Sequence, residues 1–161
     1  ANTYGVARLL VSQGWSPDRF EIEGWTLEPL EAWAAAHGRF PHDPVRESFF
    51  REETGDFFEQ GCFASIRFCC VDILTEPAAA PFDLILCNGL LGGPILHRPE
   101  SVRRIVSCLS RLLVPGGLLL AADHFHGGCK KNIPGETLGD AFKACGLSVA
   151  EAGEGISGAR I

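Results

Sequence analysis

The stretch PFDLILCN, residues 81–88, decides the fold class of this chain. Its apolar positions run almost without interruption from Phe82 to Cys87, which is typical of a parallel strand buried on both faces. Segments with helical periodicity alternate with strand-like segments on either side of it. This alternation predicts an α/β protein with a doubly wound, mostly parallel sheet.

The same patterns predict the elements along the rest of the chain. Helices are expected where apolar residues recur every three to four positions, and strands where they are continuous or alternate. The expected helices span residues 4–13, 27–37, 100–113 and 135–145, with partial helicity over 43–60. The expected strands span residues 19–24, 66–74, 82–87, 117–122 and 147–150. The glycine-rich residues 153–158 are expected to form the turn of a closing hairpin, because too few residues follow for a phosphate-binding helix.

Composition and charge limit the classes of function. The chain has 161 residues, of which 46% are hydrophobic, and this fits one globular domain. A net charge of −6 with scattered basic residues argues against binding to nucleic acid or to an anionic membrane. No apolar run reaches the roughly 18 residues of a membrane span, and no signal peptide opens the chain. We therefore expect a cytoplasmic protein without membrane insertion.

The cysteines support the same expectation. They are odd in number and show no framework spacing: Cys62, Cys69, Cys70, Cys87, Cys108, Cys129 and Cys145. Several lie in apolar runs, where cysteine behaves as a small buried hydrophobe. We expect reduced thiols. The chain contains no methionine, so we expect either a segment of a longer protein or an engineered sequence.

Polar residues that follow the strands are the candidate site residues, because ligands of doubly wound sheets bind at the carboxyl ends of the strands. These positions are residues 24–26, 72–73, 88–89 and 123–124. Two of them also have plain structural readings: Asn88-Gly89 favours a turn, and a tryptophan such as Trp25 is more often part of a core.

Three stretches together resemble the second half of class I S-adenosylmethionine-dependent methyltransferases. They are residues 82–88, LVPGGL at 113–118 and AFKACGL at 141–147. Within that superfamily the chain is most similar to the bacterial chemotaxis receptor methyltransferase (CheR) type, over almost its whole length. The resemblance implies a single methyltransferase-like domain over residues 1–161. It also implies S-adenosyl-L-methionine as cofactor, S-adenosyl-L-homocysteine as product, and methyl transfer to a protein carboxylate or similar acceptor.

The resemblance also implies cofactor contacts at the strand ends. Asp72, followed by Ile73, matches the position that contacts the adenine amine, and Asn88 matches the position that faces the sulfonium. Trp25 is placed to stack on adenine or ribose. A surface carboxylate is the plain alternative for Asp72. No catalytic residue is implied.

The ribose position departs from the family. An acidic residue there ends the second strand and accepts both ribose hydroxyls. Depending on the alignment, Gly24 or Thr26 occupies this position, with Glu23 one step away. A threonine hydroxyl accepts more weakly than a carboxylate, so the cofactor residues expected at this strand are Glu23, Trp25 and Thr26.

The beginning of the family pattern is also unmatched. The glycine-rich turn that holds the methionine end of the cofactor is missing, and Asn2 and Thr3 stand where it ends. No segment matches the family's first, central strand, and unpaired backbone in a sheet centre is costly. Three arrangements fill this gap: the family's second and fourth strands pair directly, another chain donates a strand, or residues before Ala1 supply it.

Two functional hypotheses follow. The first is a methyltransferase domain whose partner is a protein substrate such as a receptor domain. The second is a non-catalytic binding or regulatory module that has lost the cofactor site, favoured by the missing glycine-rich turn and by Thr26. A homodimer is a further expected assembly.

The sequence DHFHGGC at residues 123–129 is a separate cluster. His124, His126 and Cys129 are residue types that bind zinc. One such group, without a second group of ligands elsewhere in the sequence, does not predict a metal site. A general base and a polar loop over the ligand cleft are the other readings.

Overall fold

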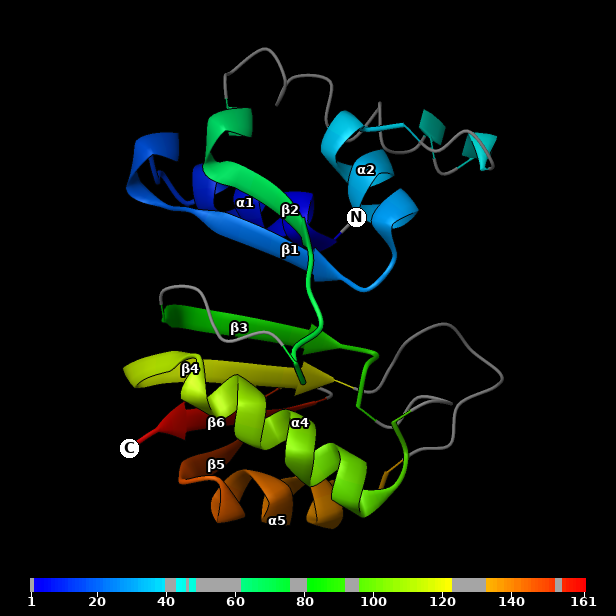
Figure 1. Cartoon of the computed structure of the whole chain (residues 1–161). Helices are drawn as coiled ribbons and strands as arrows, with labels where there is room; N and C mark the ends of the chain where they lie inside the picture. Colours follow the sequence, from blue (N-terminus) through cyan, green and yellow to red (C-terminus); the bar gives the residue numbers. More distant parts are fainter. Residues whose placement is uncertain are drawn as a thin grey trace. The chain divides into compact units, whose positions relative to one another are not determined.

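The computed structural model describes residues 2–39, 43–45, 47–48, 62–75, 81–91, 96–122, 133–152 and 155–161. The chain divides into two compact units, Ala1–Asp72 and Ile73–Ile161. Each unit has its own hydrogen-bonded sheet with helices packed on it (Figure 1). The mixed α/β fold predicted from the alternation of patterns is thereby confirmed. The expectation of a single domain stays a prediction.

The first unit is a pair of parallel strands with two helices. Its elements are α1 (Asn2–Ser12), the 3-10 helix η1 (Pro17–Arg19), β1 (Ile22–Thr26), α2 (Pro29–His37), the 3-10 helix η2 (Cys62–Ser65) and β2 (Ile66–Cys70). In the ladder, Ile22 lies opposite Ile66 and Thr26 opposite Cys70. Both strands therefore end at the same edge of the sheet.

The helices of this unit bury one face of the strand pair. The buried cluster joins residues of α1, α2 and β2: Tyr4, Ala7, Ala34 and Ile66. The Tyr4 hydroxyl donates a hydrogen bond of 2.6 Å to the carbonyl of Ala35, which ties α1 to α2. Gly24 of β1 faces this layer, since a Cβ there would lie 2.7 Å from the ring of Phe68 and 2.9 Å from Thr3 Oγ1.

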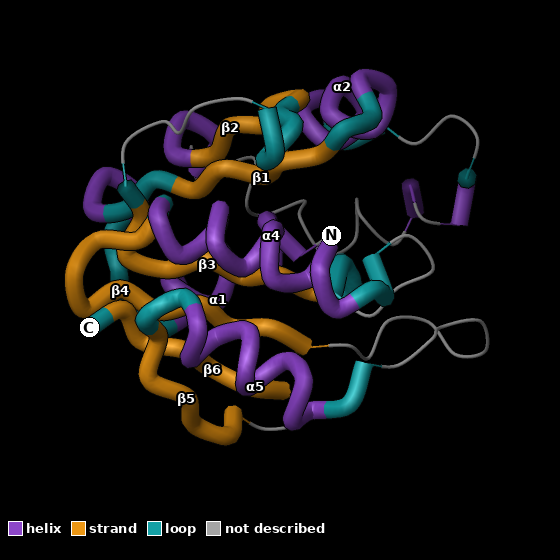
Figure 2. The backbone as a smooth tube through the Cα atoms, turned by 60° about the horizontal axis from the view of Figure 1, so that its bottom comes forward, coloured by secondary structure: helices purple, strands orange, loops and turns teal. Residues whose placement is uncertain are grey.

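The second unit is a four-stranded sheet covered on one face. Its elements are β3 (Phe82–Asn88), α4 (Pro99–Arg111), β4 (Leu113–Ala122), α5 (Gly135–Ala144), β5 (Leu147–Ala152) and β6 (Gly155–Arg160). The strand order is β3-β4-β6-β5, with β3 and β4 parallel and the other two pairs antiparallel. Helices α4 and α5 lie side by side against this sheet (Figure 2).

Successive side chains of β3 and β4 alternate between buried and exposed positions. Leu119 is fully buried and Cys87 nearly so, whereas Leu84, Leu86 and Leu118 are 40–44% exposed. Leu84 and Leu118 are register partners, so they share one face of the sheet. The apolar pattern of β3, which predicts burial on both faces, is thus only half satisfied within this unit.

Several predicted boundaries are wrong by a few residues. The strand expected over residues 19–24 is β1 at Ile22–Thr26, because η1 occupies Pro17–Arg19. The strand expected over 66–74 ends at Cys70 and is followed by a turn. The helix expected to reach residue 113 ends at Arg111. Gly38 is the C-cap of α2, with φ 60° and N–H groups directed to the last carbonyls of the helix.

The strand expected over residues 117–122 begins earlier, at Leu113, so the Pro115-Gly116-Gly117 sequence lies inside β4. The β3–β4 register shifts there, from Phe82 opposite Leu113 to Leu84 opposite Leu118. Gly116 has φ +80°, and a Cβ on Gly117 would lie 3.1 Å from the carbonyl oxygen of Phe82. These glycines permit a bulge inside one long strand. The closing hairpin is confirmed, although β6 already begins at Gly155.

Candidate functional site

Thr26 ends β1 and joins it to the following helix. Its carbonyl accepts a hydrogen bond of 2.9 Å from the N–H of Val71, which extends the ladder one residue past β2. Its Oγ1 accepts a hydrogen bond of 3.1 Å from the N–H of Glu28, directly before α2. The residue predicted at the ribose position is therefore fixed through its backbone and its side chain.

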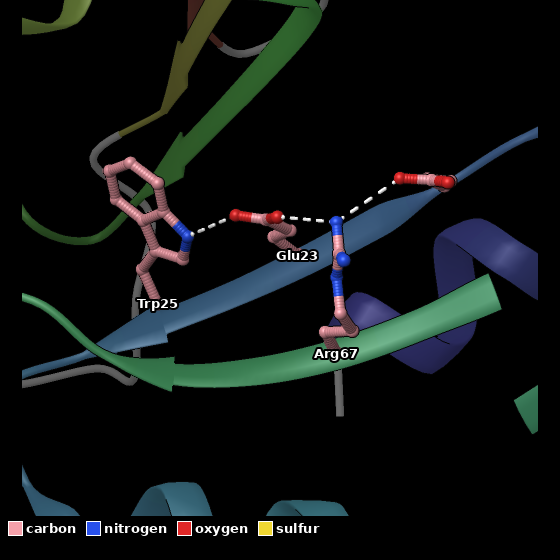
Figure 3. Close-up of polar contacts among 4 residues, drawn as sticks. Glu23, Trp25 and Arg67 are labelled. Atoms are coloured by element: carbon pink, nitrogen blue, oxygen red, sulfur yellow. Dashed lines mark hydrogen bonds and ion pairs between the residues drawn. The ribbon is translucent and has the colours of Figure 1, made fainter. Parts of the chain in front are cut away.

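Glu23 lies on the other face of β1 and is committed to neighbouring side chains (Figure 3). One carboxylate oxygen accepts a hydrogen bond of 2.8 Å from the indole N–H of Trp25. The other oxygen pairs with the Arg67 guanidinium of β2 at 2.9 Å. The Glu23 side chain is only 13% exposed. Both oxygens are occupied, so this carboxylate fastens β1 to β2 and orients Trp25.

Truncation of Glu23 is expected to destabilise the strand pair. Glu23→Ala removes the hydrogen bond to the Trp25 N–H and one ion pair of Arg67, and we expect a loss of about 1–2 kcal/mol in the free energy of unfolding. Glu21 also pairs with Arg67, at 3.1 Å, but its side chain is 78% exposed. Glu21→Ala, the matched control, is expected to change stability by about 0.5 kcal/mol or less. Equal losses in urea denaturation of the two variants would contradict this assignment.

Glu28 is a candidate that the sequence patterns missed. It precedes Pro29 at the N-cap of α2, with φ −97° and ψ 108°, and its side chain makes no capping hydrogen bond. The side chain is exposed, two residues past the end of β1. The resemblance predicts the ribose carboxylate on the strand itself, and Glu28 lies outside the strand. The available signal was a glutamate between the strand and the proline that opens the next helix.

The other predicted site residues are distributed over both units. Asp72 is half-buried, two residues past the end of β2, and closes the first unit. Ile73 opens the second unit, in the turn that follows. Asn88 ends β3 opposite Ala122 of β4 and is exposed. Gly89 has φ +69°, so the predicted turn after β3 is confirmed. The structure thus joins Glu23, Trp25 and Thr26 on one strand and places Asn88 at a separate strand end.

Cys87 lies one residue before Asn88 and is protected from ionisation. Desolvation by burial raises the pKa of its thiol from 9.0 to about 11, and a hydrogen bond with the backbone of Leu91 acts in the opposite direction. A thiol of this kind is inert at neutral pH. The described cysteines are free thiols: Cys69, Cys70, Cys87, Cys108 and Cys145.

The alkaline stability of the protein should depend on Cys87. Because its pKa is higher in the folded state, its stabilising contribution is complete below pH 9.0 and disappears as the pH rises to about 11. We expect a loss on the order of 2 kcal/mol across this range, measured by urea denaturation with a reductant present. Cys87→Ala should lose less. Its remaining slope should come from Cys145, whose pKa is raised above 9.0 by burial, and from Tyr4, whose pKa burial raises from 10.0 to about 12. An unchanged slope would contradict the role of Cys87.

Within the described ranges, no group of three histidine, cysteine or acidic side chains is arranged to hold a metal ion. The cluster of His124, His126 and Cys129 lies outside those ranges. No helix in the described part of the chain has the length and apolar character needed to cross a membrane.

Comparison with known proteins identifies the fold. No family model and no curated protein sequence matches the chain. Among solved structures, an amino pentose methyltransferase from Micromonospora echinaspora with S-adenosylmethionine bound is 16% identical, with TM-score 0.56 over 88% of this chain and 74% of that one. The S-adenosylmethionine-dependent methyltransferase SibL is 18% identical, with TM-score 0.52 over 73% and 41%.

The cyclase SpnF is also similar, at 19% identity and TM-score 0.55 over 82% of this chain and 45% of that one. The chain thus spans less than half the length of SibL and SpnF. A fold shared with a cyclase does not by itself define a reaction. The comparisons do establish that this chain has the Rossmann-like fold of class I S-adenosylmethionine-dependent methyltransferases.

Proposed function

We propose that this chain is an S-adenosylmethionine-dependent methyltransferase domain. The observation that carries the proposal is the position of exposed or half-buried polar residues at the strand ends of a methyltransferase fold: Thr26 at the end of β1 and Glu28 after it, Asp72 after β2, and Asn88 at the end of β3. Ligands of open α/β sheets bind at this end of the strands.

The donors and acceptors at these strand ends fit the cofactor. A hydroxyl, two carboxylates and an amide match the hydroxyls and amines of an adenine nucleoside. When bound, S-adenosylmethionine supplies an electrophilic methyl group on its sulfonium. Asp72 and Ile73 are assigned to the adenine, and Asn88 to the sulfonium end. Glu23 supports the site indirectly, by orienting Trp25 for stacking on the nucleoside.

The proposed acceptor is a protein carboxylate or a similar nucleophile, on a protein such as a receptor domain. An ionised carboxylate needs little acid–base help, so the role of this chain is to bind and orient the two reactants. The CheR resemblance supports this acceptor class and a cytoplasmic location. Methyl groups transferred to a carboxylate are released by mild base as methanol, whereas methyl groups on nitrogen are retained. Base-stable product would exclude the carboxylate acceptor.

Titration calorimetry with S-adenosylhomocysteine tests the cofactor site directly. We expect the unmodified chain to bind in the micromolar range, about −8 kcal/mol. Thr26→Asp adds a second carboxylate at the end of β1 while keeping an acceptor for the N–H of Glu28. We expect this variant to bind about tenfold more tightly.

The second candidate is a non-catalytic binding or regulatory module with the same fold. One observation favours it: β1 ends in a threonine, and the Glu23 carboxylate is already paired with Trp25 and Arg67. Binding by Thr26→Asp alone would indicate an intact pocket that has lost its ribose carboxylate. Absence of heat with both proteins would overturn the methyltransferase proposal and favour this module.

A further inference from the structure

We propose that the exposed side of α2 is a docking surface for a basic amphipathic helix of a partner protein. The surface consists of four exposed residues, Leu27, Leu30, Trp33 and His37, and is called the α2 surface below. The inference goes beyond the proposed function and does not depend on it, because none of these residues is assigned to the cofactor.

Helix α2 is apolar on two of its sides. Its sequence is PLEAWAAAH, in which Glu31 is the only charged side chain. Ala32 and Ala34 are buried, and the helix packs on β1 and β2 (Figure 1). Leu30, Trp33 and His37 are spaced three and four residues apart, so they share another side of the helix. A helix that is apolar on all sides is ordinarily buried, yet this second side is exposed among the described residues.

The α2 surface combines aliphatic and aromatic side chains. Leu30 is 77% exposed, Leu27 64% and Trp33 50%. The imidazole of His37 stacks on the indole of Trp33, with ring centroids 4.5 Å apart and 25° between the ring planes. Nδ1 of His37 lies 2.8 Å from the carbonyl oxygen of Trp33, which holds the stacked ring in place. Exposed apolar patches mark interaction sites, and tryptophan is enriched among the residues that dominate binding energy.

Helix α4 provides a contrast within the same chain. Its buried side carries aliphatic residues such as Val102 and Ile105, and its exposed positions carry Arg103, Arg104 and Arg111. That is the ordinary pattern of a helix with one side in water. Helix α2 has leucine and tryptophan on its exposed side instead, which indicates a side that a partner covers.

The distribution of charge decides which partner fits. The first unit, Ala1–Asp72, contains twelve acidic residues, six arginines and no lysine, so it carries the whole net charge of −6. Glu28 and Glu31 are both exposed and adjoin Leu27 and Leu30 in the sequence. Acidic surroundings attract lysine and arginine. A helix with an apolar stripe and basic flanks therefore complements both the apolar side chains and the charge.

The same charge disfavours two other occupants of the α2 surface. A second copy of this chain would bring another unit of net charge −6 against the first. A membrane with anionic lipids would also repel this unit. A basic helix is the occupant that gains from the charge.

The test uses a helical peptide of about 18 residues, composed of leucine and lysine with all leucines on one side. Fluorescence anisotropy of the labelled peptide, titrated with the full chain, gives the dissociation constant. We expect a value of about 10–100 µM. A scrambled peptide of the same composition and a peptide with glutamate in place of lysine should each bind at least about tenfold more weakly.

Substitutions locate the binding on α2. Leu30→Ala and Trp33→Ala should each weaken binding of the basic peptide at least about fivefold. Leu9→Ala, which truncates a leucine of α1 that is 60% exposed, is the matched control and should bind like the unmodified chain. Circular dichroism of each variant establishes that it is folded.

The contrary outcomes are distinct. Failure of the basic peptide to bind, equal binding of the scrambled peptide, or unchanged binding by both α2 variants would overturn the proposal. A dimer in sedimentation velocity that Leu30→Ala dissociates would assign the surface to a second copy instead. Binding to vesicles of phosphatidylcholine and phosphatidylserine that Leu30→Ala abolishes would assign it to a membrane. None of these measurements involves S-adenosylhomocysteine, so the proposed function is tested separately.

Discussion

Leu119→Ala is expected to lower the free energy of unfolding by about 2–5 kcal/mol, whereas Leu118→Ala should lower it by about 1 kcal/mol or less. The two leucines are adjacent in β4 and differ in the face they occupy. Leu119 is fully buried and Leu118 is 42% exposed. Urea denaturation followed by circular dichroism measures both losses.

The difference arises because, among the described residues, helices α4 and α5 pack on this sheet, and the face with Leu118 is left exposed. Val102 and Val106 of α4 and Phe142 of α5 are fully buried, as Leu119 is. Removing three carbon atoms there leaves a cavity that the surrounding close-packed side chains do not fill. On the other face the truncated side chain is replaced by solvent. Equal losses would mean that the exposed face is covered in solution.

Most elements of this fold follow from local patterns in the sequence. The nearly continuous apolar run at Phe82–Cys87 predicts β3 correctly, because such runs are typical of parallel strands, although one face of β3 is exposed. The periodicity of Val102, Ile105, Val106 and Leu109 predicts the buried face of α4 for a similar reason. Such patterns depend on which residues are buried, and burial dominates the energetics of a core.

Element boundaries were less predictable because they depend on tertiary contacts. The glycines at positions 116 and 117 favour a turn by their local conformation, yet β4 continues through them by pairing with β3 across a bulge. The segment after Cys70 is apolar enough for a strand, but the β1–β2 ladder ends with Thr26. A strand continues only where a partner continues beside it.

The candidate site was also predictable only in part. Thr26 and Asn88 were predicted at strand ends from sequence, and the structure places them there. The pairing of Glu23 with Trp25 and Arg67 was not predictable, because Arg67 lies 44 residues away in the chain. Only the register of two distant strands brings these side chains together. The carboxylate of Glu23 is therefore engaged by its neighbours, whereas the side chain of Glu28 is exposed.

Gly158→Ala is expected to cost about 1–3 kcal/mol of unfolding free energy through overpacking. A Cβ at this position of β6 would lie 2.6 Å from Phe142 Cδ2 and 3.0 Å from Leu147 Cβ. Phe142 is fully buried in α5 and Leu147 is 2% exposed, so neither side chain has space to move. Gly135→Ala, at the first position of α5, introduces a methyl group with nothing within 4 Å and should leave stability unchanged or slightly higher.

A double substitution separates overpacking from backbone strain at Gly158. Phe142→Ala alone removes the buried ring and is destabilising. Combined with Gly158→Ala, it removes the Cδ2 atom that the new methyl group would meet, so the double variant should be more stable than the sum of the two single losses predicts. Additive losses would locate the cost in the β6 backbone. A favourable coupling of about 1 kcal/mol or more would show that a glycine is required here because α5 packs directly against the strand.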